Sequence, residues 1–139
     1  MTIDKFIEIK EFTDEGYSPI VDFESWRVAI LNYIDELLPE NIDNMQKHDE
    51  TDEVFVLLSG RCILFIGEGT EKIEEISAVD MEPMKIYNIK KGVYHTHTLS
   101  EDAKLLIVEN QNTDDSNSPK INLSNKNLKT IVEITNSLW

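Results

Sequence analysis

The sequence predicts an all-β fold, a sandwich or barrel of short strands followed by one C-terminal helix. Three observations lead to this prediction. Short apolar runs alternate with turn signals through the middle of the chain, no helical pattern separates these runs, and helical spacing of apolar residues begins only after residue 119. Short strands at regular spacing are typical of sandwiches and barrels, whereas a parallel α/β sheet needs helices between its strands.

The first third of the chain predicts strands rather than helices. An alternating segment at 7–10 (Ile-Glu-Ile-Lys) is typical of a half-buried strand, and the turn residues at 16–19 end it. Residues 26–34 are β-branched or aromatic with few polar positions, so we expect a strand with both faces covered. Residues 36–41 include a proline and predict a loop or short turn.

The centre of the chain predicts a hairpin and three further strands. Two apolar runs, 54–58 and 62–66, are separated by a glycine turn, which is a hairpin signature. Further strands are expected at 85–89, 94–99 and 103–109. All of these elements belong to one predicted domain of residues 1–139, in which 1–25 form an N-terminal strand and loop and 26–112 form the barrel core.

The last twenty residues, 120–139, predict an amphipathic helix that packs back on the barrel. Ser124 and Asn125 are available as N-caps at its start. Apolar positions then recur at helical spacing, at Leu128, Ile131, Val132, Thr135 and Leu138.

The composition of the chain argues against several cellular locations and classes of partner. Thirteen Lys and Arg against 27 Asp and Glu give a formal charge of −14, which repels nucleic acid and anionic membranes. We find no apolar stretch near the ~20 residues of a membrane span and no signal-peptide pattern at the start. A single cysteine, Cys62, cannot build an internal disulfide framework and sits in an apolar strand, where we expect it to be buried. We therefore expect a cytoplasmic protein.

Two segments carry all three histidines and predict a metal site. His48 precedes Glu53 by five positions, and the charged turn between them would bring the carboxylate back beside the ring. His95 and His97 are alternate residues of a predicted strand and share one face, as do Gln46 and His48. Two imidazoles and one carboxylate suit a first-row divalent ion, namely Fe, Mn, Ni, Zn or Co.

These same segments give the chain a resemblance to the cupin superfamily. The first cupin motif ends His, four residues, Glu, six residues, Gly, and here His48, Glu53 and Gly60 have that spacing. The middle of the second motif, Gly-x-x-His, matches Gly92 and His95. The resemblance spans roughly residues 26–112. It implies a double-stranded β-helix, or jelly-roll, barrel in which His48, Glu53 and His95 are the metal ligands.

The departures from the motifs concern ligands and turns. Gln46 stands where the family has its first histidine, while Glu40, Lys90 and Leu99 replace a glycine, a proline and an asparagine. The amide of Gln46 offers a carbonyl oxygen, a weaker ligand. His97 lies outside the motif, but strand alternation aims it into the same cavity, where we expect it to line the wall, to replace the missing ligand or to contact a substrate. Glu109, at the end of a predicted strand, is interpreted as a surface residue.

Three functions are compatible with such a barrel, because one fold serves many activities. The first is a metal-dependent isomerase, epimerase, decarboxylase or dioxygenase acting on a small organic molecule. The second is a noncatalytic small-molecule-binding cupin with a degenerate metal site, and the third is a structural protein with a vestigial site. Whether the chain is an enzyme is left open at this point.

The apolar runs also predict a homodimer. Residues 26–34 and 54–58 are apolar at consecutive positions, so they place apolar groups on both faces of a sheet. A small barrel has one interior. The apolar side chains that face outward would be covered in part by the C-terminal helix and for the rest by a second copy of the chain.

Overall fold

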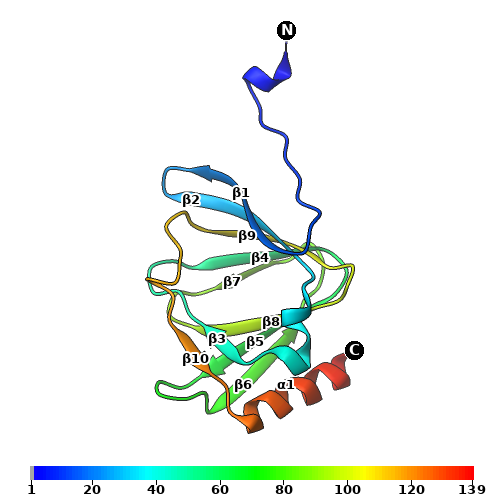
Figure 1. Ribbon diagram of the computed structural model, residues 1–139, viewed down its shortest axis with the longest axis vertical. Coiled ribbons are helices and arrows are strands. Elements are labelled where there is room, and N and C mark those ends of the chain that lie inside the picture. The colour runs from blue at the N-terminus through cyan, green and yellow to red at the C-terminus, as the bar shows by residue number, and fades with distance from the viewer. Residues whose placement is uncertain (1) are drawn as a thin grey trace.

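The strands pair into two antiparallel sheets that face one another (Figure 1). The computed structural model describes residues 2–139. The first sheet has the order β1 (Gly16–Phe23), β2 (Trp26–Asn32), β9 (Lys104–Asn110), β4 (Glu53–Ser59) and β7 (Ile86–Ile89). The second has the order β10 (Lys120–Asn122), β3 (Asn44–Gln46), β8 (Tyr94–Leu99), β5 (Cys62–Glu68) and β6 (Glu75–Asp80). The predicted all-β class is confirmed.

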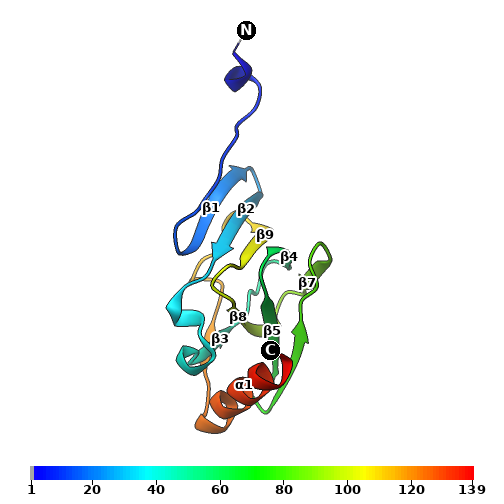
Figure 2. The same cartoon turned by 90° about the vertical axis from the view of Figure 1, so that its right-hand side faces the viewer.

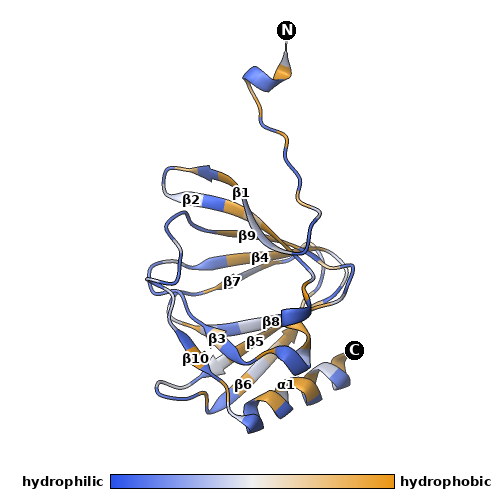
Figure 3. Ribbon diagram, viewed as in Figure 1, coloured by the Kyte–Doolittle hydropathy of each residue, from blue (hydrophilic) through white to orange (hydrophobic). Residues whose placement is uncertain are grey.

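The inner faces of the sheets form the main core. Along β9, Leu105, Ile107 and Glu109 are buried while the residues between them are partly exposed, which is the alternation of a strand with one covered face. The opposing side chains in the core include Phe55, Leu57, Leu64 and Leu99. Figure 3 shows apolar colouring on β9 and β4 of the first sheet and on β5 of the second, whereas β8 is mostly hydrophilic.

A second, smaller core lies between the second sheet and the helix α1 (Asn125–Leu138). Ile63 and Phe65 of β5 point to this side and pack in one cluster with Ile131 of the helix. β5 is therefore apolar at consecutive positions because one face meets the main core and the other meets α1. Figure 2 shows the helix lying at the end of the molecule farthest from β1.

The helix begins later than the sequence predicts. Ser124 is its N-cap: its hydroxyl accepts from the Asn127 backbone N–H at 3.1 Å, while the Asn127 side chain accepts from the Ser124 N–H at 3.2 Å. The preceding residues 120–122 form β10, paired with β3. The predicted helix over 120–139 is thus corrected to Asn125–Leu138.

The strand predicted at 7–10 is wrong, although another strand does form within the first 25 residues. Residues 7–10 form no strand, since alternation alone does not supply a hydrogen-bonding partner, and they continue an extended arm that follows a short 3-10 helix at Ile3–Lys5. Strand β1 instead runs through the predicted break at 16–19. It tolerates Pro19 because it is an edge strand with a bulge between Pro19 and Val21.

Three further elements differ from those that the sequence predicts. The sheets extend beyond the predicted core of 26–112, through β1 and β10, and β6 was not predicted. The loop expected at 36–41 contains two 3-10 helices, Asp35–Leu37 and Pro39–Asn41. None of the helices described for residues 2–139 is long and apolar enough to cross a bilayer.

Candidate metal centre and ligand cavity

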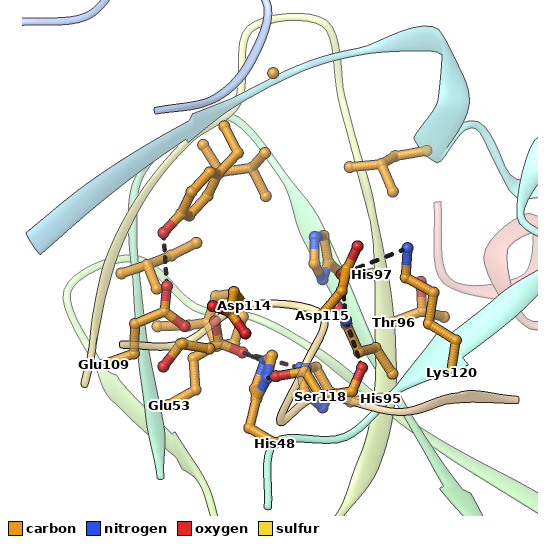
Figure 4. Close-up of a pocket in the computed structure, with 18 of the residues that line it drawn as sticks. His48, Glu53, His95, Thr96, His97, Glu109, Asp114, Asp115, Ser118 and Lys120 are labelled. Carbon is orange, nitrogen blue, oxygen red and sulfur yellow. Dashed lines mark hydrogen bonds and ion pairs between the residues drawn. The ribbon is translucent and has the colours of Figure 1, made fainter. Parts of the chain in front are cut away.

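Three of the predicted site residues meet between the two sheets (Figure 4). His48 lies in the loop after β3, Glu53 is the first residue of β4, and His95 is the second residue of β8. β3 pairs with β8 so that Gln46 lies opposite His95, which places the loop carrying His48 beside it. Strand β4 of the opposite sheet then presents Glu53 to both rings.

The contacts between these side chains converge on one carboxylate oxygen. His48 Nε2 lies 3.1 Å from Glu53 Oε1, and His95 Nε2 lies 2.9 Å from the same oxygen. All three residues are buried, and one candidate ligand atom from each lies within 4.8 Å of the others. Within residues 2–139 this is the group of His, Cys, Asp and Glu side chains that could hold a metal ion.

The ring of His95 is oriented by the backbone. Its Nδ1 lies 3.0 Å from the carbonyl oxygen of Val93. A carbonyl oxygen can only accept, so Nδ1 carries the proton and donates. In the neutral ring Nε2 then has no proton and directs a lone pair at Glu53.

The ring of His48 is oriented by a longer chain of hydrogen bonds. The Asn117 amide donates to the Asn112 carbonyl at 3.0 Å and accepts from the Asp114 N–H at 3.2 Å, so its Oδ1 is an acceptor. Ser118 Oγ, 3.0 Å from that oxygen, must donate to it. The hydroxyl therefore accepts from His48 Nδ1 at 2.7 Å, and Nε2 of the neutral ring again holds a lone pair.

This donor set fits a divalent cation. Two lone pairs of neutral imidazoles and a carboxylate oxygen point to one place, where they repel one another unless a cation or a proton lies between them. A histidine whose other nitrogen donates to a protein oxygen is the usual arrangement around protein-bound metals. Two imidazoles and one carboxylate suit iron(II) and neighbouring first-row ions.

The electrostatics of the cluster agree with its need for positive charge. Burial works against ionisation of Glu53, yet its contacts with the His48 and His95 rings hold its pKa well below the usual value. Burial also disfavours charge on His48, but the hydrogen bond and charge of Glu53 raise its pKa above the ordinary value. In the metal-free protein the raised pKa of His48 favours a proton on that ring beside the carboxylate.

Glu109 corrects a prediction made from the sequence. Interpreted as a surface residue, it is 5% exposed and lies beside Glu53 in the site. Its Oε1 accepts from Tyr17 Oη at 2.6 Å and from Arg27 Nη2 at 2.9 Å. Burial first, and then the neighbouring Glu53 carboxylate, raise the pKa of Glu109. Since Tyr17 and Arg27 come from β1 and β2, far away in the sequence, only the strand alternation pointed to this arrangement.

Gln46 and His97 lie near the cluster but are not joined to it. The Gln46 amide donates to the Ser118 carbonyl at 2.9 Å. His97 packs against Phe55, with ring centroids 5.5 Å apart, and its buried Nδ1 has no hydrogen-bond partner among the described residues. Burial, reinforced by the nearby His95, lowers the pKa of His97 to about 4, so this ring is neutral.

A cavity of about 480 Å³ opens beside the cluster. Its polar lining includes Gln46, His97 and Glu109 as well as the three residues of the cluster. Its apolar lining includes Leu31, Leu37 and Ile107. A volume of this size, with apolar walls and a few polar groups, is typical of sites for small organic ligands.

Comparison with known proteins shows the fold. No family model and no curated protein matches the sequence. A cupin-2 domain containing protein from Shewanella frigidimarina NCIMB 400 superposes with a TM-score of 0.53 at 19% identity, over 71% of this chain and 85% of that one. Streptomyces Pac13, described as a nucleoside dehydratase, gives 0.56 at 9% identity, over 83% of this chain and 87% of its own.

The iron(II) form of HppE is a third similar structure. It superposes with a TM-score of 0.50 at 16% identity, over 68% of this chain and half of that one. At such identities the likeness establishes the fold and no more. The chain thus has a cupin fold, and the predicted jelly roll with a C-terminal helix is confirmed.

Proposed function

We propose that this chain is a small-molecule-binding cupin in which His48, Glu53 and His95 hold one divalent metal ion beside the ligand cavity. The observation that carries the proposal is the orientation of the two rings. The Val93 carbonyl and the Ser118 hydroxyl each accept a hydrogen bond from an Nδ1–H, so both Nε2 lone pairs face the same carboxylate oxygen. The likeness to an iron(II) protein of the same fold supports the choice of a first-row ion.

Residues around the cluster give the cavity its chemistry. A bound divalent ion would supply Lewis acidity to a carbonyl or carboxylate of the ligand. Glu109, whose pKa is raised, is placed by Tyr17 and Arg27 to give or take a proton at the ligand. Neutral His97 offers a hydrogen-bonding nitrogen. Isomerase, epimerase, decarboxylase and dioxygenase chemistry are all compatible with this set.

One observation favours the alternative, a noncatalytic ligand-binding cupin. Gln46 replaces an imidazole of the family motif, and its amide is bonded to the Ser118 carbonyl rather than to the cluster. With one imidazole fewer, the centre binds metal more weakly. Under this alternative the protein binds small molecules in the same cavity without metal, and uridine, with which Pac13 was solved, is one ligand to test.

Calorimetric titration of chelator-treated protein with Fe(II), Mn(II), Co(II), Ni(II) and Zn(II) tests the proposal. We expect one ion per chain. Glu53→Gln keeps the shape of the side chain and removes its charge, and should weaken binding at least tenfold. Glu50→Gln, an exposed neighbour outside the cluster, is the matched control. Gln46→His should strengthen binding.

Two results would count against the metal centre. One is the absence of saturable binding for all five ions. The other is equal affinity of the Glu53→Gln and Glu50→Gln proteins when circular dichroism shows both to be folded. Saturable binding of an organic ligand by such a protein would support the alternative.

A further inference from the structure

Two polar side chains in the cavity wall have hydrogen-bonding capacity that the protein does not use, and the first is Gln46. Its Nε2 donates to the Ser118 carbonyl oxygen at 2.9 Å, and a carbonyl oxygen can only accept, so the orientation of the amide is fixed. No group among residues 2–139 donates to Oε1 of the same amide. Gln46 lines the cavity and therefore offers it a free acceptor.

The second side chain, His97, offers a donor. Its Nδ1 is buried and has no hydrogen-bond partner in the described part of the chain. A buried N–H without an acceptor is rarer in proteins than a buried acceptor without a donor, so Nδ1 is the nitrogen without a proton and Nε2 carries one. His97 lines the cavity while its Nδ1 is shielded from solvent, so the far edge of the ring, with Nε2, faces the cavity.

The pairing of β3 with β8 places this acceptor and this donor near one another. Gln46 lies opposite His95, and His97 is two residues further along β8 on the same face. Diagonal neighbours of this kind are about 7 Å apart, a distance that one small ligand group between the two side chains can span. An acceptor beside a donor complements a group in which an N–H adjoins a C=O, as in a carboxamide.

The cations of the cavity wall are already paired with carboxylates. Among the described residues that line the cavity, Arg27 and Lys120 are the Arg and Lys side chains. The Arg27 guanidinium donates to Glu109 and to two backbone carbonyls. Lys120 Nζ lies 4.0 Å from Asp115 Oδ1, and Figure 4 shows the two side chains joined at one side of the cavity. Neither cation is free to bind an anionic ligand.

Carboxyl groups outnumber these cations in the same wall. The cavity is lined by Glu36, Glu53, Glu109, Asp114 and Asp115. A carboxylate or phosphate on a ligand would lie among like charges, and like charges brought together disfavour binding. The wall therefore favours a ligand without negative charge.

We propose that the cavity binds an uncharged organic molecule through a carboxamide group, whose N–H donates to Gln46 Oε1 and whose C=O accepts from His97 Nε2–H. The body of the molecule packs on the apolar wall, which includes Leu31, Phe55 and Ile107. This inference rests on the proposed function for the use of the cavity, and it names the class of ligand. It does not require the metal ion.

Matched amides and carboxylates test the class of ligand. Nicotinamide and nicotinate, and benzamide and benzoate, differ in the amide and the carboxylate but share one ring. We expect the amide of each pair to bind at least about tenfold more tightly in titrations of chelator-treated protein at a pH of about 8, where free histidines are neutral. The same titrations on zinc-loaded protein show what the ion adds.

Variants of His97 test the donor. His97→Leu removes it and should weaken nicotinamide binding about tenfold, whereas His97→Gln supplies an amide N–H and should restore part of the affinity. Asn136→Leu, on the exposed face of α1, is the matched control and should bind as the wild type does. Circular dichroism on each variant separates loss of binding from loss of fold.

Nitrogen-15 NMR of the imidazole rings tests the tautomer directly. The chain has three histidines, so the signals that disappear in His97→Leu belong to His97. We expect a proton on Nε2 of His97, and on Nδ1 of the other two rings. A proton on Nδ1 of His97 in the neutral ring would overturn the inference.

The binding data can overturn it in two further ways. One is the absence of saturable binding for both amides, and the other is a carboxylate that binds as tightly as its amide in chelator-treated protein. Metal binding without a preference for amides would remove this inference and leave the metal centre. A preference for amides in a protein that binds none of the five metal ions would support the inference and remove the metal centre.

Discussion

Two hydrogen bonds outside the cluster set the ring orientation and the tautomer of His95 and His48. Val93 holds His95 through its backbone, which no substitution removes, whereas Ser118 holds His48 through a side chain that can be changed. The Ser118 hydroxyl is also the link to Asn117, so it sets both the ring orientation and the tautomer of His48. In this respect Ser118 is a positioning residue for the proposed centre.

Replacing Ser118 by alanine tests that role. Without the hydroxyl acceptor the His48 ring can rotate and place its proton on either nitrogen, so we expect metal affinity to fall about 10- to 100-fold. Ser118→Thr, which keeps a hydroxyl, should restore part of the loss. Ser116→Ala in the same loop is the control, because Ser116 bonds to Asp114 and not to the cluster. Equal affinities for Ser118→Ala and Ser116→Ala would refute the role of Ser118.

Residue spacing was sufficient to place Glu53 beside His48, five positions away across a turn. His95 is 42 positions from Glu53, and the resemblance of Gly92 and His95 to the second cupin motif predicted its place in the same site. Residue spacing was not sufficient for Ser118 or Glu109. Ser118 is 70 positions from His48, and its contact depends on the loop that follows β9. Glu109 was assigned to the surface because its partners Arg27 and Tyr17 lie on strands whose pairing the sequence does not show.

At the scale of elements, the two motif glycines have different structural roles. Gly60, which directly follows β4, has φ of +71°, and a Cβ there would lie 2.5 Å from Ala103 Cα. Gly92 has φ of +79°, but a Cβ would meet nothing within 4 Å. Both turns require the left-handed region, which costs other residues about 1–2 kcal/mol, and only the turn at Gly60 also lacks space.

The pair Gly60→Ala and Gly92→Ala therefore separates strain from crowding. We expect Gly92→Ala to lower the free energy of unfolding by about 1 kcal/mol and Gly60→Ala to lower it by about 3 kcal/mol or more. Urea denaturation followed by circular dichroism measures both. Similar losses for the two variants would mean that the close approach of Ala103 to Gly60 does not matter to stability.

Element prediction succeeded where the apolar pattern was strong and failed where tertiary pairing decides. β4, β5, β8 and β9 lie within two residues of their predicted bounds. The 7–10 segment alternates just as clearly but has no partner strand. Strand β1 includes Pro19 because, at the edge of a sheet, the N–H that proline lacks is not needed for a hydrogen bond to a second neighbour. Pattern alone does not indicate which edges are free.

At the scale of the whole molecule, protons and metal ions compete for the same cluster. The folded-state pKa of His48 is raised, so its stabilising charge is fully present below the ordinary value of about 6.5 and is lost as pH rises through the folded pKa. Metal binding needs the neutral ring and is favoured over that same range.

We therefore expect opposite pH trends for the two forms. As the pH rises from about 6 to about 8, metal affinity should increase, while the free energy of unfolding of the metal-free protein should lose the contribution of His48. Titration calorimetry and urea denaturation at several pH values measure the two quantities. Metal affinity that stays constant or falls over this range would place the ion away from the histidines.

An anomalous difference map from crystals soaked in Co(II) tests the metal centre most directly. The account predicts one strong peak between the sheets, about 2.0–2.2 Å from Nε2 of His48, Nε2 of His95 and a carboxylate oxygen of Glu53. The peak should vanish in the Glu53→Gln protein and persist in Glu50→Gln. A map with cobalt bound only elsewhere, or with no peak near these three residues at saturating metal, would contradict it.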